Sequence, residues 1–276
     1  MASSHESFVW VNMNKELQPR VAVLKAPGTN CDVETAYGFE LAGARPQIIL
    51  MESLKRGEVD LSEFQIAAFP GGFSYGDDLG SGTVFAAILD SYFGNQIERF
   101  REKGLMIGIC NGDQILMRSG LLPFGTLGER QMTLDKNDSG KFKSGRVKLS
   151  FEPSRCVFLQ DMKALGPIEL QVAHGEGKHM PLNDDVLRRI EENDQVVFRY
   201  LDVQLESTEE YPYNPNGSPN GIAGICDPSG RILGLMPHPE RSILREQYPN
   251  WRRMPADFEP QGLKIFQRMV EYASQM

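Results

Sequence analysis

The feature that most constrains the fold is a regular alternation of short apolar runs with longer, helix-like segments. The runs RVAVLK, PQIILM, QIAAFP and LMIGIC begin at Arg20, Pro46, Gln65 and Leu105. Each run has the length of a buried strand, and the segments between them are long enough to cross back over a sheet. The pattern predicts an α/β fold with a largely parallel central sheet flanked by helices.

The intervening segments carry helix signals. In the turn APGTNCD, Asn30 or Asp32 is expected to cap a helix that runs to Gly43. The stretch from Thr83 to Gly104 is a long helix in which Gly94 is a candidate interruption.

Beyond Leu122 the pattern changes to shorter strands, typical of antiparallel additions to the sheet. The expected strands cover residues 145–151, 155–159, 167–174, 195–201, 221–227 and 231–237. Segments 128–145 and 211–221 are expected to be loops, 184–193 a short helix, and 262–275 a helix that covers the sheet. We therefore predict one domain, residues 20–276, after a tail of residues 1–19 in which residues 8–11 dock on the body.

Charge and cysteine spacing exclude several classes of function. The net charge of −8 disfavours a general nucleic-acid binder or a binder of anionic membranes. No apolar run is as long as a membrane span, and the N-terminus does not resemble a signal peptide. The four cysteines are far apart and form no CxxC pair, which favours neither a zinc framework nor a disulfide scaffold. A reducing cytosol is the simplest setting.

Cys110 lies between Gly108 and Gly112, at a strand end and before a helix that should stop at Gly120. This G-x-C-x-G turn is the nucleophile-elbow pattern with sulfur as the nucleophile. The positive end of the following helix favours a thiolate, and the backbone N–H of Asn111 can face an oxyanion. The alternative is a buried structural cysteine at the end of a strand.

His238 is the best candidate base for this cysteine. Pro237 and Pro239 hold its backbone extended, so that Glu240, two residues on, can orient the imidazole by a hydrogen bond. The alternative is a solvated histidine in a turn.

Two further segments are candidates for the same crevice. Gly71 and Gly72 open a glycine-rich loop after a strand and let backbone N–H groups approach a substrate carbonyl, unless the loop is simply a flexible connection. His174, Glu176 and His179 suggest a metal, but their spacing matches no common zinc motif, so no metal is expected. A polar loop beside the crevice, with His174 as a substrate contact, is the simpler interpretation.

These motifs together resemble a known family, the class I, triad-type glutamine amidotransferases. Within that class, PGTNCD, PGGFSYGDDL, CNGDQIL, AHGEG, NPNGSPNGIAGI and MPHPERS are similar to the glutaminase subunits of phosphoribosylformylglycinamidine synthase. The resemblance runs in the same motif order from about Val21 to Glu271. It implies a flavodoxin-like sheet and hydrolysis of glutamine to glutamate and ammonia. By this resemblance Cys110 is the nucleophile, His238 transfers the proton and Glu240 orients His238.

The resemblance also implies a half-enzyme. Gly72 and Asn111 would form the oxyanion hole, and Gln114 would help to hold glutamine. Ammonia would pass to a separate synthetase subunit that uses ATP and Mg²⁺ to amidate formylglycinamide ribonucleotide in purine biosynthesis, with a small third subunit in some systems. No cofactor is expected in this chain. Asp113 replaces the apolar residue usual in stand-alone subunits, and we expect it either to disfavour the thiolate or to contact the partner.

Two other classes of protein are compatible with a cysteine elbow. One is a cysteine hydrolase of the small-protein-deglycase or intracellular-protease type, but the late His238-Pro239-Glu240 segment argues against it. The other is a non-catalytic scaffold, which would tolerate loss of the triad, whereas all three residues are present.

Overall fold

The computed structural model describes residues 18–77 and 79–276. Within this part of the chain, nine strands form one sheet in the order β2-β1-β3-β4-β11-β10-β9-β6-β7, and β5 pairs with β8 in a separate ribbon. The predicted docking of residues 8–11, and with it most of the tail, lies outside the described residues.

One half of the sheet is parallel. Its strands are β1 (Arg20–Lys25), β2 (Arg45–Leu50), β3 (Ile66–Phe69), β4 (Leu105–Ile109) and β11 (Ile232–Leu235). β1 pairs with β2 and β3, and β4 pairs with β3 and β11, all in parallel register. Every residue of β3, β4 and β11 is buried, which explains why these runs are continuously apolar. The predicted parallel α/β sheet is confirmed.

The other half is antiparallel. It consists of β10 (Ile222–Cys226), β9 (Val196–Leu201), β6 (Lys143–Phe151) and β7 (Ile168–His174). Four successive antiparallel pairings lead from β11 to β7. An even number of reversals makes β7 run in the same direction as β11, so His174 lies at the edge where β4 and β11 also end.

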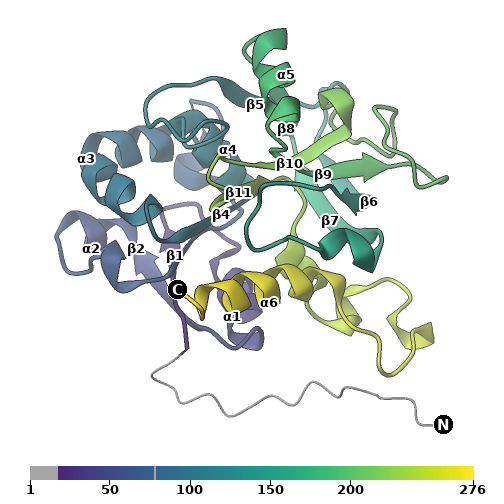
Figure 1. Ribbon diagram of the computed structural model, residues 1–276, viewed down its shortest axis with the longest axis horizontal. Helices are drawn as coiled ribbons and strands as arrows, with labels where there is room; N and C mark the ends of the chain where they lie inside the picture. The colour runs from purple at the N-terminus through teal and green to yellow at the C-terminus, as the bar shows by residue number, and fades with distance from the viewer. Residues whose placement is uncertain (1–17, 78) are drawn as a thin grey trace.

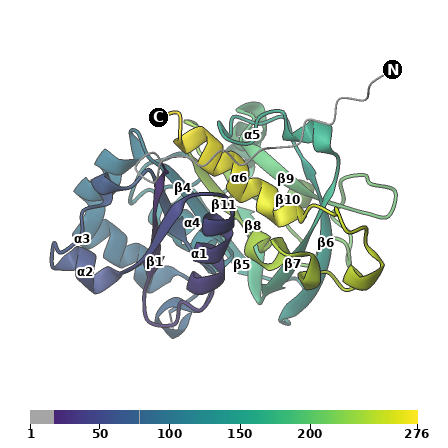
Figure 2. The same cartoon turned by 90° about the horizontal axis from the view of Figure 1, so that it is seen from below.

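Helices cover both faces of the sheet (Figures 1 and 2). The helices are α1 (Asp32–Leu41), α2 (Met51–Lys55), α3 (Thr83–Arg101), α4 (Asn111–Ser119), α5 (Asp184–Glu192) and α6 (Gln261–Ala273). α1 and α6 lie side by side on one face, where Phe39 packs edge-on against Phe266. α3 and α4 pack together on the other face, and the ribbon of β5 (Met132–Lys136) and β8 (Glu176–Pro181) lies beside α4. No helix within the described part of the chain is long and apolar enough to cross a membrane.

Several local predictions are wrong. Segment 128–145 is not a loop, because it contains β5, in which Met132 and Leu134 alternate inward with exposed or half-exposed polar neighbours. Residues 155–159 form turns, since the amides of Arg155 and Val157 bond to Asp194 and Gly230 rather than to a strand.

Two helix predictions also need correction. Neither Asn30 nor Asp32 caps α1: the capping residue is Cys31, which makes no side-chain cap, and the helix ends at Leu41 before Gly43. Asp32 instead pairs with Lys25 at 2.5 Å. α3 continues through Gly94 without interruption. The predicted stop at Gly120 is confirmed by its left-handed φ of 84°.

Candidate active site

The candidate residues lie at one edge of the sheet because their strands run in the same direction. Cys110 follows β4, Gly71 and Gly72 follow β3 closely, and His238 follows β11. His174 ends β7 at that edge, where the backbone N–H of His238 donates to Gln171 O at 2.7 Å. The sequence thus brings four separate segments to one crevice, as expected at the carboxyl ends of parallel strands.

Cys110 is held in a strained turn. Its φ of 53° and ψ of −103° lie outside the regions that an L-residue ordinarily adopts, and its N–H donates to Leu235 O at 2.8 Å. The flanking glycines permit this turn. A Cβ on Gly108 would lie 2.6 Å from the backbone of Gly112, and a Cβ on Gly112 would lie 1.8 Å from Phe69 O. The G-x-C-x-G pattern is therefore a packing requirement for bringing α4 against β3 and β4.

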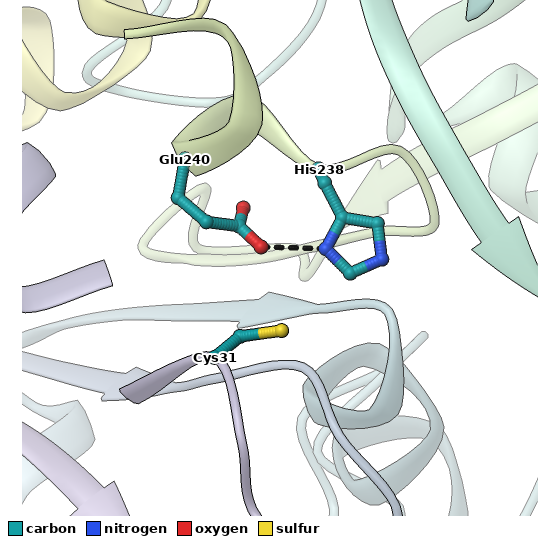
Figure 3. A group of neighbouring side chains, drawn as sticks. All are labelled: Cys31, His238 and Glu240. Carbon is teal, nitrogen blue, oxygen red and sulfur yellow. Dashed lines mark hydrogen bonds and ion pairs between the residues drawn. The ribbon is translucent and has the colours of Figure 1, made fainter. Parts of the chain in front are cut away.

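His238 and Glu240 form a buried pair (Figure 3). His238 Nδ1 lies 2.5 Å from Glu240 Oε1, and both side chains are almost fully buried. Burial alone lowers the pKa of His238, but the Glu240 carboxylate and the neighbouring Cys110 together raise it well above its ordinary value. His238 Nε2 is buried with no hydrogen-bond partner among the described residues. That nitrogen is free to exchange a proton with a thiol or a leaving group.

Cys31 adds a contact to this pair that sequence reasoning missed. Its sulfur lies beside the His238 ring in Figure 3, and it accepts a hydrogen bond from Arg241 Nη2 at 3.3 Å. A Cβ on Gly71 would lie 2.8 Å from His238 Cε1 and 3.1 Å from the Cys31 sulfur. Gly71 is thus the residue that lets the imidazole and Cys31 approach the loop.

Cys31, His238 and Glu240 also need to be considered as metal ligands, because one sulfur, nitrogen or oxygen atom of each lies within 4.8 Å of the others. The 2.5 Å separation of Nδ1 and Oε1 is a hydrogen bond, and it is too short for two ligands that each lie about 2.1 Å from one zinc ion. The alternative trio suggested by the sequence is not brought together as one set of ligands. His174 and Glu176 line the same cavity, but His179 lies outside that lining, beside Ser218 and Asp113.

Gly72 and Asn111, the two residues expected to form an oxyanion hole, lie in the loop after β3 and at the start of α4. Gly72 has a φ of 146° and forms an isolated antiparallel β-bridge with Thr29. A Cβ at Gly72 would lie 2.8 Å from Asn30 N and from Gly28 O. Asn111 begins α4, where backbone N–H groups have no partner within the helix. The Asn111 side chain accepts from Ser74 N at 3.1 Å, which ties the helix start to the glycine-rich loop.

A cavity of about 470 Å³ opens beside Cys110. It is lined by Asn30, Gly72, Phe73, Asp77, Ser81, Cys110, Gln114, Phe142, Ala173, His174, Gly175, Glu176, His238 and Arg241. Gln114 is fixed in this wall because its Nε2 donates to Glu176 O at 2.6 Å and its Oε1 accepts from Asn111 Nδ2 at 2.9 Å. The Cys110 sulfur lies 3.7 Å from Ala173 O, so the thiol stands between the elbow and the end of β7.

Asp113 points away from this cavity. It is fully buried, and its Oδ2 lies 3.2 Å from His179 Nε2. Burial raises its pKa, and His179 opposes that rise. Gly234 leaves the space for it, since a Cβ there would lie 2.0 Å from Asp113 Oδ1. The expected contact with a partner is therefore wrong, because the side chain has no exposed surface; Asp113 joins α4 to β8 in the interior.

The comparisons with known proteins agree with this geometry. The model of the CobB/CobQ-like glutamine amidotransferase domain matches residues 18–273. The phosphoribosylformylglycinamidine synthase subunit PurQ of Dehalococcoides mccartyi is 44% identical over 93% of this chain and 98% of its own length. A probable phosphoribosylformylglycinamidine synthase, chloroplastic/mitochondrial, of Arabidopsis thaliana is 36% identical over 94% of this chain but only 19% of its own length. A chain in the structure of PurLQS from Thermotoga maritima is 29% identical, with a TM-score of 0.68 over 92% of this chain and 99% of that chain.

Proposed function

Since the chain belongs to the CobB/CobQ-like glutamine amidotransferase domain family, we propose that it is the glutaminase subunit of a phosphoribosylformylglycinamidine synthase. It hydrolyses glutamine to glutamate and ammonia, and it supplies the ammonia for conversion of formylglycinamide ribonucleotide to the amidine in purine biosynthesis. The observation that carries this proposal is the meeting of a strained cysteine elbow with a buried His–Glu pair at one cavity.

The first half of the reaction follows from the triad. Cys110 Sγ attacks the side-chain carbonyl carbon of glutamine while His238 Nε2 takes the thiol proton. The carbonyl oxygen becomes an oxyanion that accepts hydrogen bonds from the N–H groups of Gly72 and Asn111. His238 then gives its proton to the departing nitrogen, and ammonia leaves a γ-glutamyl thioester on Cys110. Glu240 stabilises the imidazolium and fixes the tautomer of His238.

The second half returns the enzyme to its starting state. A water molecule gives a proton to His238 and attacks the thioester carbon, which forms a second tetrahedral oxyanion held by the same N–H groups. Collapse of this intermediate breaks the C–S bond, Cys110 regains its proton from His238, and glutamate leaves. Gln114 and His174, which line the cavity, hold the substrate during both halves, whereas Gly71 acts through its contact with His238.

The ammonia is used elsewhere. A synthetase subunit that binds ATP and Mg²⁺ receives it, in some systems together with a small third subunit, and this chain needs no cofactor of its own. The setting is the cytoplasm. The domain comprises residues 20–276, after a tail of residues 1–19.

The test is glutamate release from glutamine by the chain together with its synthetase, ATP and formylglycinamide ribonucleotide. We expect Cys110→Ala to abolish release while added ammonium still supports amidation by the complex. Glutamate release that persists in Cys110→Ala would contradict the assignment of Cys110 as the nucleophile. No glutamate release by the unaltered complex would contradict the glutaminase function itself.

A further inference from the structure

A fully buried pair of titratable side chains joins the first turn of α4 to β8. Asp113 Oδ2 lies 3.2 Å from His179 Nε2, and neither side chain has any exposed surface. Neither of these two atoms makes a hydrogen bond to a third group among the described residues. Each side chain is therefore the group that compensates the burial of the other.

The His179 end of this pair is fixed by the loop between β9 and β10. Ser218 Oγ accepts from His179 N at 3.0 Å and donates to Asn216 Oδ1 at 2.8 Å. Asn216 Nδ2 donates to Gly177 O at 2.7 Å, on the same strand as His179. Asn216 and Ser218 are fully buried, so the segment NPNGSPNG braces β8 from within the protein.

The Asp113 end of the pair contacts the strand that leads to His238. A Cβ on Gly234 in β11 would lie 2.0 Å from Asp113 Oδ1, so the carboxylate packs directly on that strand. β11 ends at Leu235, shortly before His238, and Leu235 O accepts from Cys110 N at 2.8 Å. Asp113 follows Cys110 by one turn of α4. It thus lies between the helix that begins after the nucleophile and the strand that leads to the base.

We propose that Asp113 and His179 are positioning residues, which set the distance between the Cys110 thiol and the His238 imidazole. His179, braced by Ser218, keeps Asp113 seated on β11. Asp113 in turn keeps the first turn of α4 from sliding along that strand. Neither side chain of the pair is part of the cavity lining, so the pair acts on the reaction through the two groups that it positions. Its role in turnover rests on the proposed function.

The experiment uses two substitutions of His179 that differ in reach. His179→Gln places an amide N–H where Nε2 stood and so keeps a donor for Asp113, whereas His179→Asn is too short to reach it. Each variant is compared with the unaltered chain in the complex with its synthetase, and kcat and KM for glutamine are measured well below the melting temperature. Asp113→Ser against Asp113→Asn repeats the comparison from the other end of the pair, should His179→Asn fail to fold.

The matched control is Gln195→Ala. Gln195 is also fully buried, and its Nε2 donates to Pro123 O and Cys226 O. It lies at the opposite edge of the sheet from the site, because Cys226 ends β10, which runs antiparallel to β11.

A second assay needs neither glutamine nor a partner. The isolated chain of each variant is treated with iodoacetamide, and alkylation of the peptide that contains Cys110 is followed by mass spectrometry. The rate reports how well the elbow and His238 activate the thiol.

We expect His179→Asn to lower kcat by about 10- to 100-fold with KM changed by less than about threefold, because a 1 Å displacement of a reacting group costs on the order of 10²-fold in rate. It should also slow the alkylation of Cys110. His179→Gln should recover most of both losses. Gln195→Ala should lower the melting temperature but keep the wild-type kcat and alkylation rate.

A purely structural role predicts a different result. His179→Asn would then have a lower melting temperature, with kcat and the alkylation rate of the folded protein at wild-type values, and that result would overturn the inference. Equal losses in His179→Asn and His179→Gln would overturn it as well. If alkylation follows the expected order but the unaltered complex releases no glutamate, the positioning inference stands and the proposed function fails.

Discussion

The tightest packing in the site is between α4 and β3, and Gly112→Ala tests it. The added Cβ would lie 1.8 Å from Phe69 O and 2.7 Å from its carbonyl carbon. The helix start would have to retreat by roughly 1.5 Å to restore van der Waals separation. Overpacking of this kind costs about 1–3 kcal/mol of unfolding free energy, and a 1 Å displacement of a reacting group costs on the order of 10²-fold in rate. Since Asn111 and Cys110 move with the helix, kcat should fall more than KM rises.

The assay is glutamate release by the complex, together with thermal unfolding of the isolated chain. Gly145→Ala in β6 is the matched control, because a Cβ there meets nothing within 4 Å. We expect the control to retain wild-type kcat and melting temperature. Wild-type kcat and melting temperature in Gly112→Ala would refute the argument that the elbow needs glycine for close packing.

Three further predictions follow from individual side chains. Gly94→Ala should stabilise the chain by about 0.5–1 kcal/mol in thermal melts, because α3 is continuous there and the nearest atom to a new Cβ is Leu127 Cδ2 at 3.4 Å. The pKa of His174 is about 3 in the folded protein and 6.5 in the unfolded chain. The unfolding free energy that the neutral ring preserves is therefore complete above pH 6.5 and is lost as the pH falls toward 3, by up to about 1.4 kcal/mol per pH unit. In denaturant titrations, the unfolding free energy of His174→Gln should fall less steeply with decreasing pH than that of the wild type. An unchanged dependence on pH would contradict this. Glu240→Gln should lower kcat by on the order of 10⁴-fold with little change in KM, and a loss under tenfold would show that the 2.5 Å pair does not act in catalysis.

The sequence predicts the parallel half of the fold well because its strands are buried on both faces. Such strands are continuous apolar runs between turn residues, as LMIGIC and QIAAFP are. β5 and β8 are harder to predict. They form a short ribbon whose polar neighbours hide the alternation of Met132 and Leu134. The run RCVFL is apolar because Cys156, Phe158 and Leu159 are buried, yet burial does not require a strand.

In the candidate site, too, some residues can be predicted from the sequence and others cannot. Cys110, His238 and Glu240 lie in short local patterns, so their convergence follows once the strand directions are known. The contacts of Cys31 with Arg241, and the pairing of Asp113 with His179, join residues far apart in the chain. No local pattern marks such pairs. The contact of His174 with Asn137 likewise joins two segments that are far apart in the chain.

The central claim is that Cys110 carries the γ-glutamyl group during turnover, and trapping that intermediate tests it most directly. The complex is mixed with isotopically labelled glutamine, quenched in acid within the first turnovers and digested, and the cysteine peptides are examined by mass spectrometry. We predict label on the peptide that contains Cys110, and no label on that peptide in Cys110→Ala. Label on Cys31, the other thiol beside His238, or glutamate release with no labelled peptide at any time, would contradict the account.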